Sequence, residues 1–341
     1  MTTYVELQTT SHFSFLRGAS SPEELFVAAA SQGHSALGLC DRGSVAGMVR
    51  GLSGQEATGV RLIAGTRVDL RDDRSLLLYA TDRAAWSRLT RLLSLGKARG
   101  GKGNCWLDWP DIAASAEGLV AILLPDAADE RTRLDLAELQ GAFGARAYLA
   151  LSLRRRPGDF ARLRALDALA QELGVRSVAC GDILYHAPER RPLQDVLTAI
   201  REKTTVDALG FKRERFMDRA LKSPAEMERR FALFPDAIQA TAAIAAACRF
   251  DLAEIRYQYP YEQVMEGRTA QEALAALTEE GASRMFPGGV PPAYRKQIDH
   301  ELRLIGELDY APYFLTVNSI VAESRRRGIL CQGRGSAASA S

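Results

Sequence analysis

Short apolar runs that alternate with amphipathic stretches place the strongest constraint on the fold of this chain. Up to about residue 186, the apolar runs have the length and composition of buried strands. They cover residues 4–7, 36–40, 61–70, 76–80, 119–124, 147–153 and 175–180. Helical spacing between them is clearest at residues 22–31, 84–95 and 159–173. Strands that alternate with helices predict an α/β fold with a parallel, barrel-like sheet, whose functional residues gather at the carboxyl ends of the strands.

Helical segments without intervening strands follow the predicted barrel. They cover residues 193–200, 225–231 and 237–248. This pattern indicates a helical layer after the barrel. Thr269 and Glu272 have the spacing of a capping box, so we expect a new helix to begin there. The sequence therefore predicts two domains, residues 1–260 and residues 261–341.

Composition and charge narrow the class of protein. Of the 341 residues, 47% are hydrophobic and 25% are charged, as in an ordinary globular protein. The formal net charge of +2 is too small to steer the whole chain towards nucleic acid, so arginine clusters have to be judged locally. Five cysteines without a Cys-x-x-Cys pair, together with the lack of a long apolar segment, favour a reduced, cytoplasmic location and no membrane contact.

Five segments of the N-terminal half follow one another in the order of a known family. They are residues 7–18, 36–43, 59–67, 117–121 and 179–185. Together they resemble the PHP (polymerase and histidinol phosphatase) domain. The resemblance implies a distorted (β/α)7 barrel that binds a metal cluster at its mouth through His and carboxylate side chains.

The positions that match the metal ligands of this family have mostly lost that chemistry. By the resemblance, the positions of lost ligands hold Gln8, Thr10, Arg17, Arg42, Arg67 and Leu184. Only Asp41 and Asp182 remain competent to bind a metal. Two carboxylates do not make a polynuclear site, and guanidinium groups repel cations. We therefore predict a degenerate cleft without metal.

Three interpretations of this degenerate cleft remain open. Arg17, Arg42 and Arg67 could replace the metals by pairing with Asp41 and Asp182, since a buried carboxylate needs a partner. The guanidiniums could instead extend to solvent. As a third interpretation, the cleft could bind an anion, either a phosphate or an acidic group of a partner. The glycine-rich residues 99–104 are expected to form an open loop, as a connector or a phosphate binder.

The C-terminal stretch reads as two helices and a glycine loop. Gly328 is expected to end the second helix after Arg325, Arg326 and Arg327, and residues 329–331 are expected to form a short strand. The loop that follows consists of Gly333, Arg334, Gly335 and Ser336. Glycines, a guanidinium and a hydroxyl are suited to hold a polyphosphate.

Residues 300–338 resemble the entry to the palm of bacterial C-family (DnaE-type) DNA polymerases. The resemblance implies that Gly333, Arg334, Gly335 and Ser336 contact the triphosphate of the incoming nucleotide. The Mg²⁺-binding catalytic aspartates come later in this family, so the chain is expected to be a fragment with no cofactor of its own and no polymerase activity by itself.

Residues 13–20, 22–25 and 191–201 are most similar to the error-prone, ImuC-like branch of this family. That resemblance implies a DNA-directed DNA polymerase for damage-induced mutagenesis and translesion synthesis. Its implied partners are a DNA primer-template, dNTPs, a sliding clamp and an ImuB-like adaptor, and the barrel is then a scaffold. Two other classes remain open, namely an adaptor module whose cleft binds a partner and a metal-dependent phosphoesterase.

Overall fold

The computed structural model describes residues 4–213, 216–255 and 265–331. All seven predicted strands occur in it and form one sheet. They are β1 (Glu6–Thr9), β2 (Ala36–Leu39), β3 (Arg61–Asp69), β4 (Ser75–Ala80), β5 (Leu119–Leu123), β6 (Ala147–Ser152) and β7 (Arg176–Cys180). The strands lie side by side in the order of the sequence. The α/β barrel-like prediction is therefore confirmed.

One strand departs from the parallel arrangement that the sequence predicts. Strand β4 runs antiparallel to both β3 and β5, whereas the other neighbouring strands are parallel. A tight turn joins β3 to β4, and the Leu70 N–H donates to the Arg74 carbonyl across it at 2.7 Å. Such a short connection permits only a hairpin, because a parallel pair needs a long crossover.

The two edges of the sheet meet through the residues that follow β1 and β7. Thr9 forms a parallel bridge with Ile183. The Ile183 N–H donates to the Gln8 carbonyl at 2.7 Å, and the Thr10 N–H donates to the Ile183 carbonyl at 2.9 Å. These bonds close the sheet into a barrel and bring the end of β1 next to Asp182.

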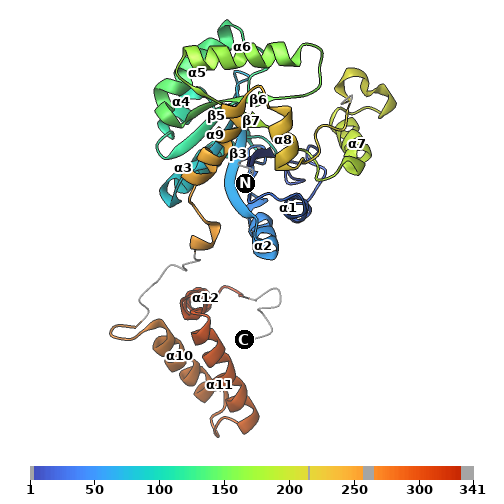
Figure 1. The fold of residues 1–341 in the computed structure, drawn as a ribbon. Helices are drawn as coiled ribbons and strands as arrows, with labels where there is room; N and C mark the ends of the chain where they lie inside the picture. Colours follow the sequence, from blue (N-terminus) through green and yellow to red (C-terminus); the bar gives the residue numbers. More distant parts are fainter. Residues whose placement is uncertain (1–3, 214–215, 256–264, 332–341) are drawn as a thin grey trace. The chain divides into compact units, whose positions relative to one another are not determined.

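Helices surround the sheet of the first unit (Figure 1). They are α1 (Pro22–Ser31), α2 (Met48–Thr58), α3 (Arg83–Gly100), α4 (Trp109–Ala114), α5 (Glu130–Phe143), α6 (Asp159–Glu172), α7 (Arg191–Arg201), α8 (Pro224–Arg230) and α9 (Pro235–Ala247). Helix α3 continues through Gly100, so the predicted loop begins later than residue 99. Its open backbone starts at Gly101, whose φ of +66° ends the helix.

Helix α9 blocks one end of the barrel. The barrel interior is a cluster of buried side chains such as Leu7, Ile63 and Ile122, and Ile244 of α9 belongs to the same cluster. The Val5 N–H at the start of β1 donates to the Thr241 hydroxyl at 3.0 Å. Since α9 covers the amino ends of the parallel strands, only their carboxyl ends are left to form a cleft.

The chain divides into two compact units, Met1–Ile255 and Arg256–Ser341. The second unit contains α10 (Ala270–Met285), α11 (Pro292–Glu307) and α12 (Ala311–Arg326), packed around a small apolar core. The capping box of Thr269 and Glu272 begins α10 as predicted. None of the described helices is long and apolar enough to cross a membrane.

Two predictions for the C-terminal stretch have different outcomes. Gly328 adopts a φ of +66° directly after α12, which confirms it as the residue that stops the helix. No strand forms over residues 329–331, so that prediction is wrong for the described chain. The loop of Gly333, Arg334, Gly335 and Ser336 lies outside the described residues.

Candidate functional site

Most of the predicted cleft residues gather at the open end of the barrel. Gln8 lies near the end of β1, Asp41 follows β2, Arg67 lies near the end of β3 and Asp182 follows β7. The carboxyl ends of barrel strands share one rim, which is why distant residues meet there. Their side chains form separate polar groups rather than one.

The first group is centred on Asp182, which is 3% exposed. Its Oδ1 accepts from Gln8 Nε2 at 2.9 Å and lies 2.7 Å from Arg219 Nη2, while its Oδ2 lies 3.4 Å from Arg154 Nη2. Burial alone would raise the pKa of this carboxyl, but Arg219, Arg154 and, less strongly, Arg67 outweigh it and hold the pKa below its usual value. Asp182 is therefore an ionised, paired carboxylate.

Asp41, in contrast, has no arginine partner within the described chain. It is fully buried, and its carboxylate accepts from the Ser11 N–H at 2.9 Å, the Ser11 hydroxyl at 2.8 Å and the Ser14 hydroxyl at 2.7 Å. Burial raises the pKa of Asp41 although these donors oppose the shift. The hypothesis that the cleft arginines neutralise Asp41 is therefore wrong, because nearby hydroxyls satisfy this carboxylate instead.

The cleft arginines have a different counter-charge, which the sequence reasoning missed. Asp69, the last residue of β3, forms ion pairs with Arg42 and with Arg67, the latter at 2.9 Å, and it accepts from the Ser75 hydroxyl at 2.6 Å. Burial raises the pKa of Asp69, but Arg67 and Arg42 outweigh burial and lower it overall. Spacing could have revealed this pair, because residues i and i+2 of a strand share a face.

Arg17 has no carboxylate within ion-pair distance in the described part of the chain. It follows Leu16, a non-glycine residue at a φ of +57°. Arg201 of α7 fixes this turn by donating from Nη1 to the Leu16 carbonyl at 2.7 Å. Burial, followed by repulsion from Arg42 and Arg201, lowers the pKa of Arg17 to about 10. Arg17 therefore remains charged at neutral pH, next to other cations.

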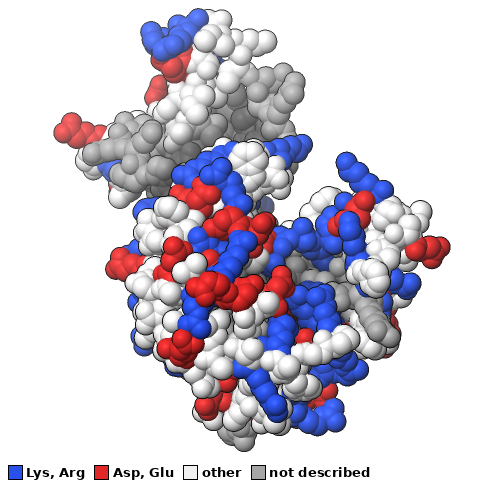
Figure 2. Space-filling model, turned by 90° about the horizontal axis from the view of Figure 1, so that it is seen from above, with Lys and Arg blue, Asp and Glu red and all other residues white. Residues whose placement is uncertain are grey.

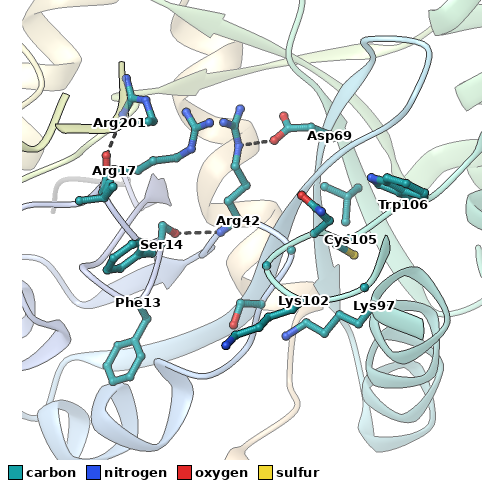
Figure 3. Close-up of a pocket in the computed structure, with 18 residues that line it drawn as sticks. Phe13, Ser14, Arg17, Arg42, Asp69, Lys97, Lys102, Cys105, Trp106 and Arg201 are labelled. Carbon is teal, nitrogen blue, oxygen red and sulfur yellow. Dashed lines mark hydrogen bonds and ion pairs between the residues drawn. The ribbon is translucent and has the colours of Figure 1, made fainter. Parts of the chain in front are cut away.

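One wall of a cleft of about 860 Å³ contains Leu16, Arg17, Arg42, Asp69 and Arg201. Lys97 of α3 and the turn that carries Lys102 form another wall, and Trp106 lines the cleft near Cys105 (Figure 3). The charged residues that line the cleft are Arg17, Arg42, Lys97, Lys102, Arg201 and Asp69. Asp69 is the only acid among the described lining residues, so positive charge is in excess.

Six of the predicted cleft residues do not line this cleft, namely Gln8, Thr10, Asp41, Arg67, Asp182 and Leu184. Leu184 packs against a small apolar cluster that includes Ala19 and Tyr185. Thr10 uses its backbone N–H in the barrel-closing bond to Ile183. His186 does not line the cleft either, since its Nδ1 lies 2.8 Å from the Ser20 hydroxyl.

The residues at the barrel mouth do not suit the metal cluster that the PHP resemblance implies. Within the described ranges, no group of three or more His, Cys, Asp or Glu side chains is placed to hold a metal ion. The oxygens of Asp41 accept from serine groups, and those of Asp182 face Gln8 and two guanidiniums. That the cleft is metal-free stays a prediction, which a measurement of metal content can test.

Comparison with known families shows which domain families the chain matches. Residues 6–159 match the PHP domain, and residues 272–341 match the bacterial DNA polymerase III alpha NTPase domain. This chain contains a PHP domain. The predicted recognition is therefore confirmed, and the residues that match the PHP family span β1 to β6 and the helices between them.

Relatives of this PHP-containing chain are error-prone polymerases. The chain is 53% identical to "Error-prone DNA polymerase 2" of Rhizobium meliloti and 52% identical to "Error-prone DNA polymerase 1" of Agrobacterium fabrum. Each match covers 98% of this chain and 31% of the relative, so the chain spans about a third of their length. An amidohydrolase from Chromobacterium violaceum shares 13% identity over 53% of this chain and 87% of its own, at a TM-score of 0.43.

Proposed function

We propose that this chain is the N-terminal part of an error-prone DNA-directed DNA polymerase that acts in damage-induced mutagenesis and translesion synthesis. The observation that carries the proposal is the similarity to error-prone DNA polymerases along 98% of the chain, at about half identical residues. The match of residues 272–341 to the DNA polymerase III alpha NTPase domain supports it independently of the PHP domain.

In this proposal, the PHP barrel is a catalytically inactive scaffold without metal. Arg17, Arg42 and Arg67 occupy positions that a hydrolytic PHP site would give to ligands, and guanidiniums cannot bind cations. We assign residues 1–260 to the PHP domain with its helical layer and residues 261–341 to the palm. The alternative of a phosphoesterase has no support from the residues at the barrel mouth, and no contact in the structure favours an adaptor.

The remaining parts of the proposal concern the complete polymerase. Gly333, Arg334, Gly335 and Ser336 would hold the triphosphate of the incoming nucleotide, and Mg²⁺ would be bound by residues outside this chain. A DNA primer-template, dNTPs, a sliding clamp and an ImuB-like adaptor are the proposed partners. Phosphoryl transfer depends mostly on positioning and charge neutralisation, which suits a glycine loop with an arginine.

Primer extension by the full-length protein tests the proposed activity. We expect Mg²⁺-dependent extension across a template lesion, with more misincorporation than a replicative polymerase shows. Deleting residues 1–260 should abolish soluble, active polymerase, because the barrel supports the palm. Full activity of that truncated protein would refute the scaffold role, and a lack of extension by the intact protein would refute the polymerase assignment.

Elemental analysis of the purified 341-residue chain tests the metal-free cleft. We expect less than stoichiometric zinc, manganese or iron after purification without chelators, because two separated carboxylates do not form a polynuclear site. An R42H variant serves as a comparison, since by the resemblance it returns an imidazole to one former ligand position. A full equivalent of metal in the unaltered chain would contradict the proposal.

A further inference from the structure

The cleft at the barrel mouth carries more positive charge than its own residues neutralise. Asp69 already pairs with Arg42 and Arg67. No ion pair within the described chain involves Arg17, Lys97 or Lys102. The formal net charge of the chain is only +2, yet Lys and Arg side chains gather on part of the face that Figure 2 shows. Charge is therefore concentrated locally, which the overall balance conceals.

We propose that this cleft binds single-stranded nucleic acid, with its backbone phosphates between the arginine and lysine walls and a base against Trp106. Arg17 and Arg42 lie together on one wall, and Lys97 and Lys102 line another part of the same cleft (Figure 3). A strand that follows the cleft can therefore place different phosphates against the arginines and the lysines. Guanidiniums bind phosphate oxygens in a bidentate manner, which makes such contacts strong.

Electrostatic repulsion within the cleft favours an anionic ligand. Burial is the largest cause of the lowered pKa of Arg17, and repulsion from Arg42 and Arg201 adds to it. An anion relieves that repulsion without breaking any ion pair of Arg17. Fixed, clustered cations around a recess bind a polyanion more strongly than the same charges spread over a surface.

The backbone holds these cations in place. Leu16 adopts the left-handed conformation, which is costly for a residue with a branched side chain, and Arg201 stabilises it through the Leu16 carbonyl at 2.7 Å. The same turn directs Arg17 into the cleft (Figure 3). On the other wall, Gly101 and Gly103 both have positive φ values on either side of Lys102.

Exposed aromatic rings favour nucleic acid over other anions. Trp106 is 47% exposed and Phe15 is 83% exposed, and both line the cleft. The Trp106 N–H donates to the Gly96 carbonyl at 2.9 Å, which anchors its loop to α3. Grooves that bind single strands combine cations for the backbone with aromatic rings for the bases. An acidic peptide would use the cations but has no base to stack on Trp106.

The size of the cleft favours a single strand over a duplex. A volume of about 860 Å³ lies within the usual range of small-ligand sites, roughly 300 to 1,000 Å³, so it admits a nucleotide with an unpaired base. In a duplex the bases are stacked and paired, so they cannot reach a ring at the side of a recess. This binding site goes beyond the scaffold role and does not depend on polymerase activity.

Fluorescence anisotropy of a labelled oligothymidine of about 12 nucleotides tests the proposal on the 341-residue chain. We expect R17Q and K102Q each to weaken binding about fivefold and to reduce its salt dependence by about one counterion. D69N should tighten binding about twofold, because it removes the only acid among the described lining residues. R164Q is the matched control, since Arg164 is an exposed arginine of α6 outside the cleft, and it should change affinity less than twofold.

Intrinsic fluorescence and competitors complete the test. Oligothymidine should quench tryptophan fluorescence in the unaltered chain, and W106A should lose that quenching. Lys102 is exposed and unpaired among the described residues, so loss of binding in K102Q cannot come from misfolding. Equal affinity of K102Q, R17Q and R164Q would overturn the proposal. Tighter binding of a duplex or a polyglutamate peptide than of oligothymidine would also overturn it, and would indicate a duplex or a protein partner instead.

Discussion

At the scale of single residues, two buried aspartates of the barrel mouth show opposite responses to their surroundings. The pKa of Asp182 is lowered, because Arg219 and Arg154 outweigh its burial. The pKa of Asp41 is raised, because burial outweighs the donors from Ser11 and Ser14. The contributions of these two carboxylates to folding stability therefore depend on pH in opposite directions.

The sign of each dependence follows from linkage. A carboxyl whose folded-state pKa is lowered stabilises the fold above its unfolded pKa of about 3.8, and loses that contribution as the pH falls through the folded value. A carboxyl whose folded-state pKa is raised has the opposite effect. As the pH rises above the unfolded pKa of about 3.8 and through the folded value, ionisation of this group lowers the stability of the fold. Ionised Asp182 therefore favours folding at neutral pH, whereas ionised Asp41 opposes it.

We predict that D182N lowers the free energy of unfolding by about 3 kcal/mol at pH 7, because Arg219 and Arg154 lose their shared anion. The loss should shrink as the pH falls below about 3.8. D41N should stay within about 1 kcal/mol of the unaltered chain, because an amide oxygen can still accept from the Ser11 N–H.

Urea unfolding followed by tryptophan fluorescence measures both variants. All three tryptophans, Trp86, Trp106 and Trp109, lie in the first unit, so the signal reports the barrel. A larger loss in D41N than in D182N at pH 7 would contradict the assignment of the paired carboxylate.

At the scale of elements, local sequence signals determine where helices begin. Ser21 accepts from the Glu24 N–H at 3.1 Å, and the Ser21 N–H donates to Glu24 Oε2 at 2.9 Å. Pro22 occupies the first position of α1. This capping box depends only on neighbours in the chain, so four consecutive residues are enough to predict it.

We predict that S21A lowers the free energy of unfolding by about 1 kcal/mol, because the Glu24 N–H loses its acceptor. The melting temperature should fall by about 3 °C. S87A is the matched control, because Ser87 is exposed within α3 and its hydroxyl makes no bond in the described chain. Thermal unfolding of both variants decides the matter, and equal shifts would show that the cap contributes nothing.

At the scale of the whole molecule, the two units differ in how much apolar surface they bury. The first unit has a large core outside the sheet and another inside the barrel. Among the described residues of the second unit, the buried part of the core cluster consists of Ala273, Leu274, Ala311 and Leu315. A core this small supplies little stability of its own, because stability grows with the apolar area that is buried.

We predict that residues 1–255 fold without the second unit. Their thermal unfolding, followed by tryptophan fluorescence, should be cooperative and should have the same midpoint as in the 341-residue chain. Residues 265–331 expressed alone should unfold at a lower temperature and over a broader range. A broad, shifted transition of residues 1–255 would show that the second unit stabilises the barrel.

The sequence by itself determined the elements and their order, since strand runs, helical spacing and caps depend on residues close together in the chain. The loss of ligand chemistry at the PHP positions stays a prediction from the resemblance, whereas the relatives among error-prone polymerases agree with the predicted branch. The short turn after Leu70 was visible in the sequence, but its consequence for the direction of β4 depends on pairing across the sheet.

Only the tertiary structure decided how the charges at the barrel mouth are paired. Arg219 and Arg154 reach Asp182 from distant segments, and Asp69 takes the role that the sequence suggested for Asp41. Arg17 lines the same cleft as Lys102, about 85 positions away in the chain, because the rim brings distant loops together. Ion pairs form between groups that are close in space. Which groups are close depends on how the barrel arranges its strands, helices and loops.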